Sequence, residues 1–368
     1  MKANDNQRGL YLLALGLLVA AVALAGGWSI WGGTDAASNV AVAPSPAATR
    51  QAQVEVETGA VIEPQTTPEA DAQKVSTVVY YQDNYGYLVP VMCSMNYEDG
   101  IAKATLKRMV QSPENDMSAA RLGLRCVLPE NTSIDLDISG GTARIDLGKE
   151  VLNMADAAAE SNMISAIVQT LTEFDSVKKV EILVGGQKLE KLPHGTDISK
   201  PFERGDINLE TAVPGADGTD MAAVRLYFPC ESGNVVVPVT RMVASRADVN
   251  TAMVELAKGP SGVSPLERAL PAGCGLIDVK LENGVAKLNF TKEFRQLVEN
   301  SDGGRMALKA LVLTCTQFDG VDGVEIYVEG EKYDAGEGAL SVPSFANVAS
   351  QIESDYIQAQ SEMIFDFE

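Results

Sequence analysis

The sequence predicts an α+β protein made of two tandem copies of a small module, in which a β-sheet packs with two helices. Three observations support this fold class. Five sequence blocks occur twice in the same order, at offsets between 142 and 148 residues. Each copy alternates runs of strand periodicity with runs of helix periodicity. The chain has 368 residues, of which 46% are apolar and 21% charged, enough for two globular domains.

The repeated blocks define a module of about 130 residues. The pairs are Tyr87–Val91 with Val235–Val239, Leu128-Pro129 with Leu270-Pro271, Ile134–Leu147 with Ile277–Phe290, Leu171–Phe174 with Cys315–Phe318, and Val177–Gly186 with Val321–Gly330. These blocks contain backbone and core signals and few reactive groups. The repeat therefore favours binding or assembly over catalysis.

Each copy begins with a predicted β-hairpin and an amphipathic helix. The hairpin strands are Thr77–Tyr81 and Tyr87–Val91 in the first copy, and Val224–Phe228 and Val235–Val239 in the second. Apolar residues then recur at i, i+4, i+7 and i+8 from Ala102 and again from Val249, the spacing of one helix face. Asp248 is a suitable N-cap for the second helix, and Gly259-Pro260 ends it.

The rest of each copy reads as two strands, a second helix and a closing strand. Gly140-Gly141 and Asn283-Gly284 each separate two alternating runs and are typical of tight hairpin turns. The second helices are expected over Ala157–Phe174 and Arg305–Phe318, and the closing strands over Lys179–Val184 and Val324–Val328. The order ββ-α-ββ-α-β predicts helices on one face of a small sheet.

Residues 10–30 form an uncharged apolar stretch, long enough to cross a bilayer as a helix. Lys2 and Arg8 precede it and the next basic residue is Arg50, so the positive-inside rule places the N-terminus in the cytoplasm and the bulk outside. Trp28 and Trp31 lie at the outer end, where an interfacial aromatic belt is expected.

A cleaved signal peptide is the alternative for this stretch, because Ala23-Leu24-Ala25 fits a cleavage site and cleavage after Ala25 would release a secreted protein. The apolar run continues past that site, which favours a retained single-pass membrane anchor. A buried helix of a soluble domain is the third and weakest interpretation.

The predicted organisation has five parts: an anchor or signal at 1–32, a flexible linker at 33–74, modules at 75–210 and 220–349, and an acidic tail at 350–368. Four prolines among Ala, Thr, Gln, Val and Glu, without an apolar period, indicate the linker. The tail interleaves aromatic and aliphatic residues with carboxylates. It is expected either to dock on a partner or to pack against the second copy.

Charge and composition exclude several functions. Twenty-nine Lys and Arg against fifty Asp and Glu give a net charge of −21, which opposes nucleic-acid binding. His194 is the sole histidine and is expected in an exposed turn, so no multi-histidine metal or acid–base site is possible. Asp135, Asp137 and Asp146 alternate along strands and are expected to form a solvated face.

No motif of nucleophilic or phosphate-binding enzymes is present. Gly259-Pro-Ser-Gly262 lacks the closing glycine of a nucleophile elbow, and the chain has no phosphate-binding glycine loop. We therefore expect no catalytic, cofactor-binding or metal-binding residues and no enzymatic activity. A pair of carboxylates far apart in the sequence, as glycoside cleavage uses, stays open as an alternative.

The five cysteines are Cys93, Cys126, Cys230, Cys274 and Cys315. Export permits disulfides, but an odd count leaves at least one thiol free or paired between chains. Apolar residues flank Cys126 and Cys315, so buried thiols are expected. Bridged cysteines remain the alternative.

The repeated blocks resemble the GerM domain, a module of sporulation and spore-germination proteins in endospore-forming bacteria. The second copy carries the resemblance best, through Ala223–Phe228, Val235–Arg241, Glu255–Pro260, Ala269–Gly273, Asn283–Phe290, Ala310–Phe318 and Val321–Gly330. The first copy departs at Val110-Gln-Ser-Pro113 and Gly141-Thr-Ala143, while Leu171–Phe174 and Val180–Gly186 still fit. Members in the best-known lineage are lipoproteins, whereas no lipid-acceptor cysteine follows the apolar stretch here.

This resemblance implies a non-enzymatic role. GerM domains are similar to ring-building motifs of secretion and sporulation channels, and the family is linked to the channel complex between mother cell and forespore. The implied partners are sporulation channel proteins or further copies of the chain, in the extracytoplasmic space. The alternative is a peptidoglycan-binding, cell-wall-associated module that acts with wall hydrolases.

Overall fold

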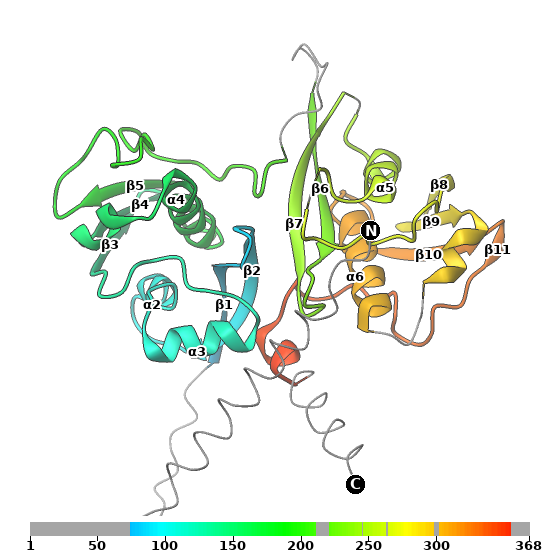
Figure 1. Cartoon of the computed structure of the whole chain (residues 1–368), viewed down its shortest axis with the longest axis horizontal. Helices are drawn as coiled ribbons and strands as arrows, with labels where there is room; N and C mark the ends of the chain where they lie inside the picture. The colour runs from blue at the N-terminus through cyan, green and yellow to red at the C-terminus, as the bar shows by residue number, and fades with distance from the viewer. Residues whose placement is uncertain (1–73, 211–220, 245, 263, 298–301, 355–368) are drawn as a thin grey trace, which may run out of the picture. The chain divides into compact units, whose positions relative to one another are not determined.

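The computed structural model in Figure 1 describes residues 74–210, 221–244, 246–262, 264–297 and 302–354. All of these residues belong to one compact unit, Thr66–Glu368. The predicted anchor, and the predicted linker except Lys74, lie outside the described residues. Within the described ranges, no helix has the length and apolar character to cross a membrane.

The first module runs from β1 to the segment that ends at Glu210. Its elements are β1 (Lys74–Gln82), β2 (Leu88–Asn96), α2 (Ile101–Lys107), α3 (Pro113–Arg121), β3 (Ile134–Ser139), β4 (Thr142–Leu147), the 3-10 helix η1 (Lys149–Asn153), α4 (Ala157–Leu171) and β5 (Lys179–Val184).

The second module runs from β6 to the segment that ends at Val348. Its elements are β6 (Ala222–Pro229), β7 (Val236–Val243), α5 (Val249–Lys258), β8 (Leu276–Glu282), β9 (Val285–Phe290), the 3-10 helix η2 (Lys292–Gln296), α6 (Asp302–Thr316), β10 (Gly323–Val328) and β11 (Glu331–Lys332). The predicted order of strands and helices is thus confirmed in both copies, with extra short elements.

The strands of each module form two sheets, which corrects the prediction of one sheet covered on one face. In the first module β1 and β2 form an antiparallel hairpin sheet, and β3-β4-β5 form a second sheet in which β4 and β5 are parallel. In the second module β6 and β7 form the hairpin sheet, and the order β11-β10-β9-β8 forms the other.

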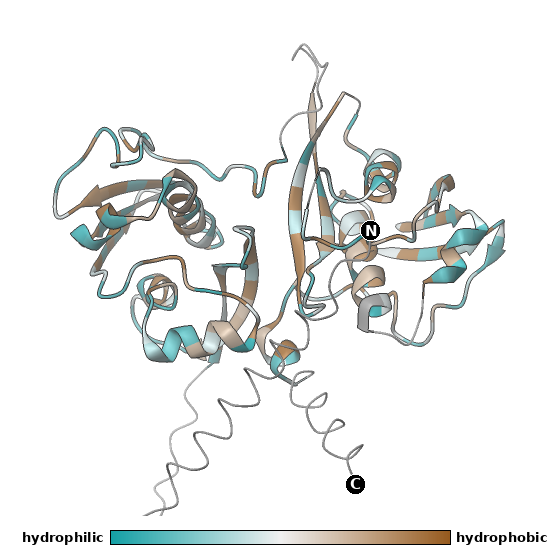
Figure 2. Cartoon of the chain, viewed as in Figure 1, coloured by the Kyte–Doolittle hydropathy of each residue, from teal (hydrophilic) through white to brown (hydrophobic). Residues whose placement is uncertain are grey.

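Helices α2 and α4 in the first module, and α5 and α6 in the second, lie between the two sheets of their module. Helix α5 contacts β6 on one side and β8 on the other, and α6 likewise contacts β6 and β10. Helix α4 is buried almost all round from Met163 to Leu171, as a helix covered on two sides must be. Figure 2 shows apolar residues on the strands and the helices between them. The burial of this helix on nearly all sides agrees with its position between two sheets.

Local signals in the sequence are confirmed where they depend on turn and cap chemistry. Gly140 and Gly141, and Asn283 and Gly284, all have positive φ, as two-residue hairpin turns require. Asp248 caps α5 by accepting a hydrogen bond from the Thr251 backbone N–H at 2.8 Å.

Helix α3 was not predicted, although its start has a clear signal. Ser112 accepts a hydrogen bond from the Asn115 backbone N–H at 3.2 Å, and Pro113 occupies the first helical position. The helix has a polar surface with one buried residue, Ala119. Its apolar periodicity is therefore weak, and periodicity alone overlooked it.

The described part of the predicted acidic tail is a short helix. Val348, just before the tail, forms a parallel β-bridge with Met92 of β2, and residues 349–354 form the helix, in which Ile352 is buried. Residues 355–368 lie outside the described part of the chain.

Candidate functional site at the junction between the modules

The junction is built where strands β2 and β7 present their outer edges. Pro90 in β2 is opposite Tyr80, and Pro238 in β7 is opposite Tyr227. The backbone N–H of each tyrosine points away from its partner strand, to Thr170 Oγ1 at 3.2 Å and Thr314 Oγ1 at 3.1 Å. The outer edge at each proline therefore offers a carbonyl and no N–H donor, which interrupts a direct strand ladder.

Two asparagines supply the missing hydrogen bonds across this junction. Asn347 Oδ1 accepts from Val236 N at 2.8 Å, and its Nδ2 donates to Val236 O at 2.9 Å and Pro90 O at 3.0 Å. Asn208 Oδ1 accepts from Leu88 N at 2.9 Å, and its Nδ2 donates to Leu88 O at 2.8 Å and Pro238 O at 2.7 Å. Each carboxamide thus makes the hydrogen bonds that the backbone of a neighbouring strand would otherwise make.

The two sets of contacts are equivalent by the sequence repeat. Leu88 and Val236 are 148 positions apart, as are Pro90 and Pro238. Each asparagine therefore bonds to the equivalent leucine or valine of its own module and to the equivalent proline of the other module. Such reciprocal contacts define a pseudo-two-fold junction, the single-chain counterpart of an isologous dimer interface. The repeated Val-Pro-Val blocks therefore mark this junction.

The chain segments that carry the asparagines also cross the junction with their backbones. Thr240 N donates to Ile207 O at 3.1 Å, and Glu210 N donates to Thr240 O at 2.9 Å. Met92 N donates to Asn347 O at 2.8 Å. The last residues of each module thus pair with a strand of the other, which ties the modules together reciprocally.

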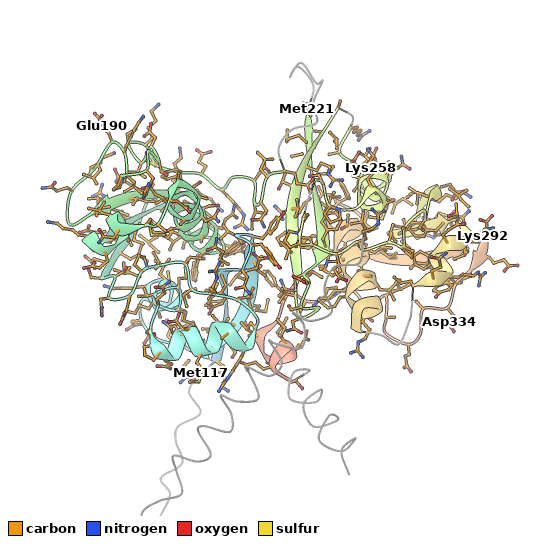
Figure 3. The ribbon with its side chains drawn as sticks, in the orientation of Figure 1. Met117, Glu190, Met221, Lys258, Lys292 and Asp334 are labelled. Atoms are coloured by element: carbon orange, nitrogen blue, oxygen red, sulfur yellow. The ribbon has the colours of Figure 1, made fainter. Side chains whose placement is uncertain are left out.

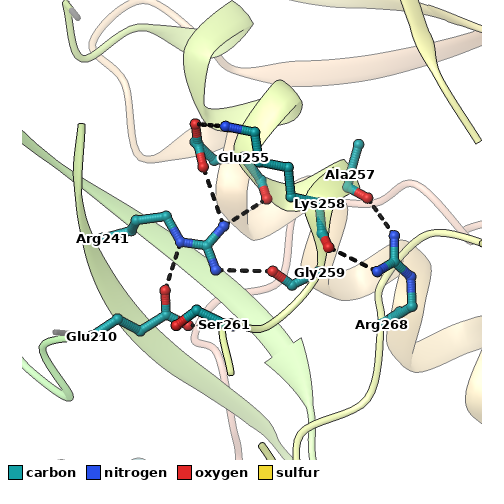
Figure 4. A network of polar contacts seen from close by, with 8 residues as sticks. All are labelled: Glu210, Arg241, Glu255, Ala257, Lys258, Gly259, Ser261 and Arg268. Atoms are coloured by element: carbon teal, nitrogen blue, oxygen red, sulfur yellow. Dashed lines mark hydrogen bonds and ion pairs between the residues drawn. The ribbon is translucent and has the colours of Figure 1, made fainter. Parts of the chain in front are cut away.

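Arg241 anchors the crossing segment of the first module onto the second (Figure 4). Its Nε lies 2.6 Å from Glu210 Oε2, and its Nη1 lies 3.2 Å from Glu255 Oε2. Its Nη1 and Nη2 also donate to Glu255 O and Gly259 O, both at 2.9 Å. Arg241 is 6% exposed, so the guanidinium is a buried charge held by two carboxylates and two carbonyls.

A cavity of about 310 Å³ lies at the junction, lined by Tyr80, Pro90, Arg204, Arg225, Tyr227 and Pro238 among others. Arg204 pairs with Glu173 and donates to Tyr80 Oη at 2.8 Å. Burial, with the nearby Glu173 carboxylate, raises the pKa of Tyr80 well above its ordinary value. The phenol therefore stays protonated and serves as a structural donor and acceptor.

The residues that the sequence singled out lie apart from this junction. His194 is in an exposed turn, as predicted, and its Nε2 lies 2.8 Å from Met154 O. Asp135 and Asp137 are exposed and Asp146 is half-buried, with Asp135 paired to Lys103 at 3.0 Å. Across the described ranges, no group of three or more His, Cys, Asp or Glu residues could hold a metal ion.

All five cysteines are free and buried, which confirms the expectation for Cys126 and Cys315 and favours buried thiols over bridges. Burial raises the pKa of Cys126 to about 12, of Cys274 to about 11 and of Cys315 to about 12. These thiols are protonated at neutral pH and are therefore poor nucleophiles.

Glu160 is a buried carboxylate that holds the turn containing His194. Its oxygens accept hydrogen bonds from His194 N and Thr196 N, both at 2.9 Å. Burial alone would raise the pKa of Glu160, but the hydrogen bonds from Thr196 and His194 outweigh it and hold the pKa below the ordinary 4.5. The ionised carboxylate therefore stabilises the fold.

We expect Glu160→Gln to lower stability at neutral pH and to reduce its acid dependence. A folded pKa below 4.5 means that the stabilisation is present above pH 4.5 and is lost as the pH falls through the folded pKa. Urea unfolding midpoints measured from pH 7 downward should therefore converge for the variant and the parent protein below pH 4.5. A constant difference at every pH would contradict this role.

Sequence reasoning missed the residues that build the junction. Asn208 and Asn347 end the segments Asp206-Ile-Asn and Phe345-Ala-Asn, 139 positions apart. An asparagine that recurs at the close of each repeat was the available signal. For Arg241 no pattern was available, because its carboxylate partners come from the linking segment and a helix.

The fold and the junction define a class of protein: a tandem repeat of α+β modules locked by reciprocal contacts. The family described as Germane, sporulation and spore germination, matches residues 78–190 and 225–334, one match in each module. The spore germination protein GerM of Bacillus subtilis (strain 168) is 32% identical over 303 residues, which cover 77% of this chain and 82% of that protein.

A solved structure, the tandem GerMN domains of the sporulation protein GerM from Bacillus subtilis, matches with a TM-score of 0.60 and 31% identity. The match covers 75% of this chain and 99% of that one. The chain belongs to this family of sporulation and spore germination proteins, as the repeated blocks predicted.

Proposed function

We propose that the chain is a non-enzymatic, extracytoplasmic assembly protein of endospore formation. In this role it is held at the membrane by its N-terminal segment and helps to build or stabilise the channel complex between mother cell and forespore. Family membership supports the link to sporulation. The mode of action, protein–protein packing, is supported by two surface strands and by the junction that joins their modules.

The observation that carries the proposal is a pair of open edge strands, one in each module. Strands β3 and β8 end their sheets, and no strand in the described ranges pairs with their outer edges. Ile138 in β3 and Leu281 in β8 occupy the same repeat position and are 38% and 53% exposed. Open edges with exposed apolar side chains are templates for pairing with another chain.

The junction makes these two edges useful together. Because Asn208, Asn347 and the crossing backbones link the modules by hydrogen bonds, the two edges belong to one compact unit. A chain with two binding edges can contact two partners at once, which side-by-side assembly into a larger complex requires.

We expect the double variant Ile138→Lys, Leu281→Lys to lose heat-resistant spores in the native host when it replaces the parent gene. The charges oppose strand pairing at the edges but cost little folding energy at exposed positions. Met117→Lys is the matched control, because Met117 is 59% exposed on α3, away from both edges. Spore counts after heating, with immunoblots for protein level, measure the effect.

The outcome also separates the rival function. Normal spore yield both in the double variant and after deletion of the gene would contradict the sporulation role. A cell-wall or cell-shape defect, together with binding of the purified chain to peptidoglycan sacculi, would favour the wall-binding alternative instead.

A further inference from the structure

In the first module, the chain itself covers the outer edge of β5. Val180 N donates to Phe202 O and Phe202 N donates to Val180 O, both at 2.8 Å, so Phe202 forms an antiparallel bridge with the strand. Lys179 and the neighbouring Glu203 form an ion pair at 2.9 Å. The covering segment reads Lys200-Pro-Phe-Glu-Arg204.

In the second module, β11 pairs with the end of the equivalent edge of β10, but the edge is open at Val324. Val324 is the repeat counterpart of Val180, 144 positions on. Gly323 N and Glu329 N donate toward β9, so alternation along the strand turns the N–H and C=O of Val324 to the outer side. Ile326 O, on the same side, accepts from Tyr333 N at 2.9 Å, but nothing in the described ranges bridges Val324 there.

The two modules also differ in the length of the segment that follows this strand. Nineteen positions separate Leu189 from Asn208 in the first module, whereas fourteen separate Tyr333 from Asn347 in the second. Figure 3 labels Glu190 and Asp334, which begin the two segments. The shorter segment lines a groove beside the strand but forms no bridge with Val324 in the described ranges.

A groove of about 660 Å³ marks the uncovered edge. Its apolar lining is Val324, Ile326, Tyr333, Ala335 and Leu340, with Ser341 at the rim. Glu325 and Lys332 also line the groove and form an ion pair at 2.7 Å, so their charges cancel. Asp334 then gives the lining of the groove a net negative charge. The groove therefore suits an apolar residue flanked by basic side chains.

We propose that this groove binds an extended segment of a partner protein, which adds to the edge of β10 as an antiparallel strand and places an aromatic residue beside Val324. The covering segment of the first module provides the template, an aromatic residue with Lys and Arg on either side. Main-chain hydrogen bonds would supply affinity, and the apolar lining and Asp334 would supply selectivity. The inference rests on the proposed function, in which the chain works by binding other proteins.

The test uses the purified full chain and a fluorescein-labelled peptide of residues 198–206 as the probe. Fluorescence anisotropy should show saturable binding, about tenfold weaker for the peptide with alanine in place of Phe202. Val324→Pro should weaken it similarly, because proline removes the outward N–H that no residue in the described ranges uses. Ser341→Trp should also weaken it by filling the groove. Ser176→Trp, at an exposed serine in the turn after α4, is the matched control and should bind as the parent does.

Three results would overturn the inference. The first is that the peptide shows no saturable binding. The second is that the Val324→Pro and Ser341→Trp variants bind the peptide as tightly as the parent does. The third is that the peptide binds only after residues 355–368 are deleted, because the chain's own tail then occupies the groove. The proposed function is tested separately, by spore counts. If the chain binds no peptide but is required for heat-resistant spores, the result contradicts the peptide-binding groove and supports the role in sporulation.

Discussion

Asn347→Leu should lower the free energy of unfolding by about 4 kcal/mol. The leucine leaves three buried backbone groups at the junction, Pro90 O, Val236 N and Val236 O, without their partner, and each such group costs about 1–3 kcal/mol. Asn347 is 0% exposed, so water cannot replace the lost bonds. Urea unfolding followed by circular dichroism measures the change.

Asn208→Leu is the matched control, because Asn208 makes the same three hydrogen bonds by the repeat but is half-buried. Water can reach that side of the junction, so the loss should be smaller. Asn347→Asp adds a second comparison: the carboxylate can accept from Val236 N but cannot donate to Pro90 O or Val236 O. Equal effects of leucine at both positions would show that burial does not decide the cost.

Arg241→Met should destabilise the protein by about 3–5 kcal/mol, because it leaves the largely buried Glu210 carboxylate without its cation and leaves Glu255 paired only with the exposed Lys258. The loss should also loosen the end of the crossing segment, since the Glu210 carboxylate pairs with Arg241 of β7 and accepts a hydrogen bond from Ser261 N at 3.0 Å. Hydrogen exchange at the amide of Glu210, which donates to Thr240 O, should then become faster.

The control for this prediction is Lys258→Met. Lys258 pairs with Glu255 at 2.5 Å but is exposed, with Glu255 retaining Arg241, so the change should stay within about 0.5 kcal/mol. Arg241→Lys keeps the charge but loses the planar fork that reaches Glu210, Glu255 and Gly259 together. If the lysine variant is as stable as the parent, charge and not geometry holds the junction.

Local features of this fold were predictable because neighbouring residues determine them. The hairpin turns at Gly140-Gly141 and Asn283-Gly284 depend on positive φ, and the cap at Asp248 depends on one side chain and the next helical turn. The closing strand Lys179–Val184 was predicted with its observed bounds. The repeat itself needs no structure at all, and it led directly to the family.

The arrangement of the sheets was not predictable in the same way. A mostly apolar segment such as Met163–Leu171 shows that a helix is buried, but not that sheets cover it on both sides. The five predicted strands of a module could form one sheet or two with the same periodicity, because periodicity records which faces are buried and not which strands are neighbours.

The class of fold, the tandem repeat, the hairpin turns, the cap at Asp248 and membership of the family follow from the amino-acid sequence, because each depends on residues close together or on a direct comparison of one copy with the other. The contacts that join the two copies are evident only in the folded protein. Asn347 contacts Pro90 and Val236, which are distant in the chain, and Arg241 contacts carboxylates from two separate segments. The partner of a buried polar group depends on which distant segments the folded chain brings together. The local sequence pattern around that group therefore does not predict its partner.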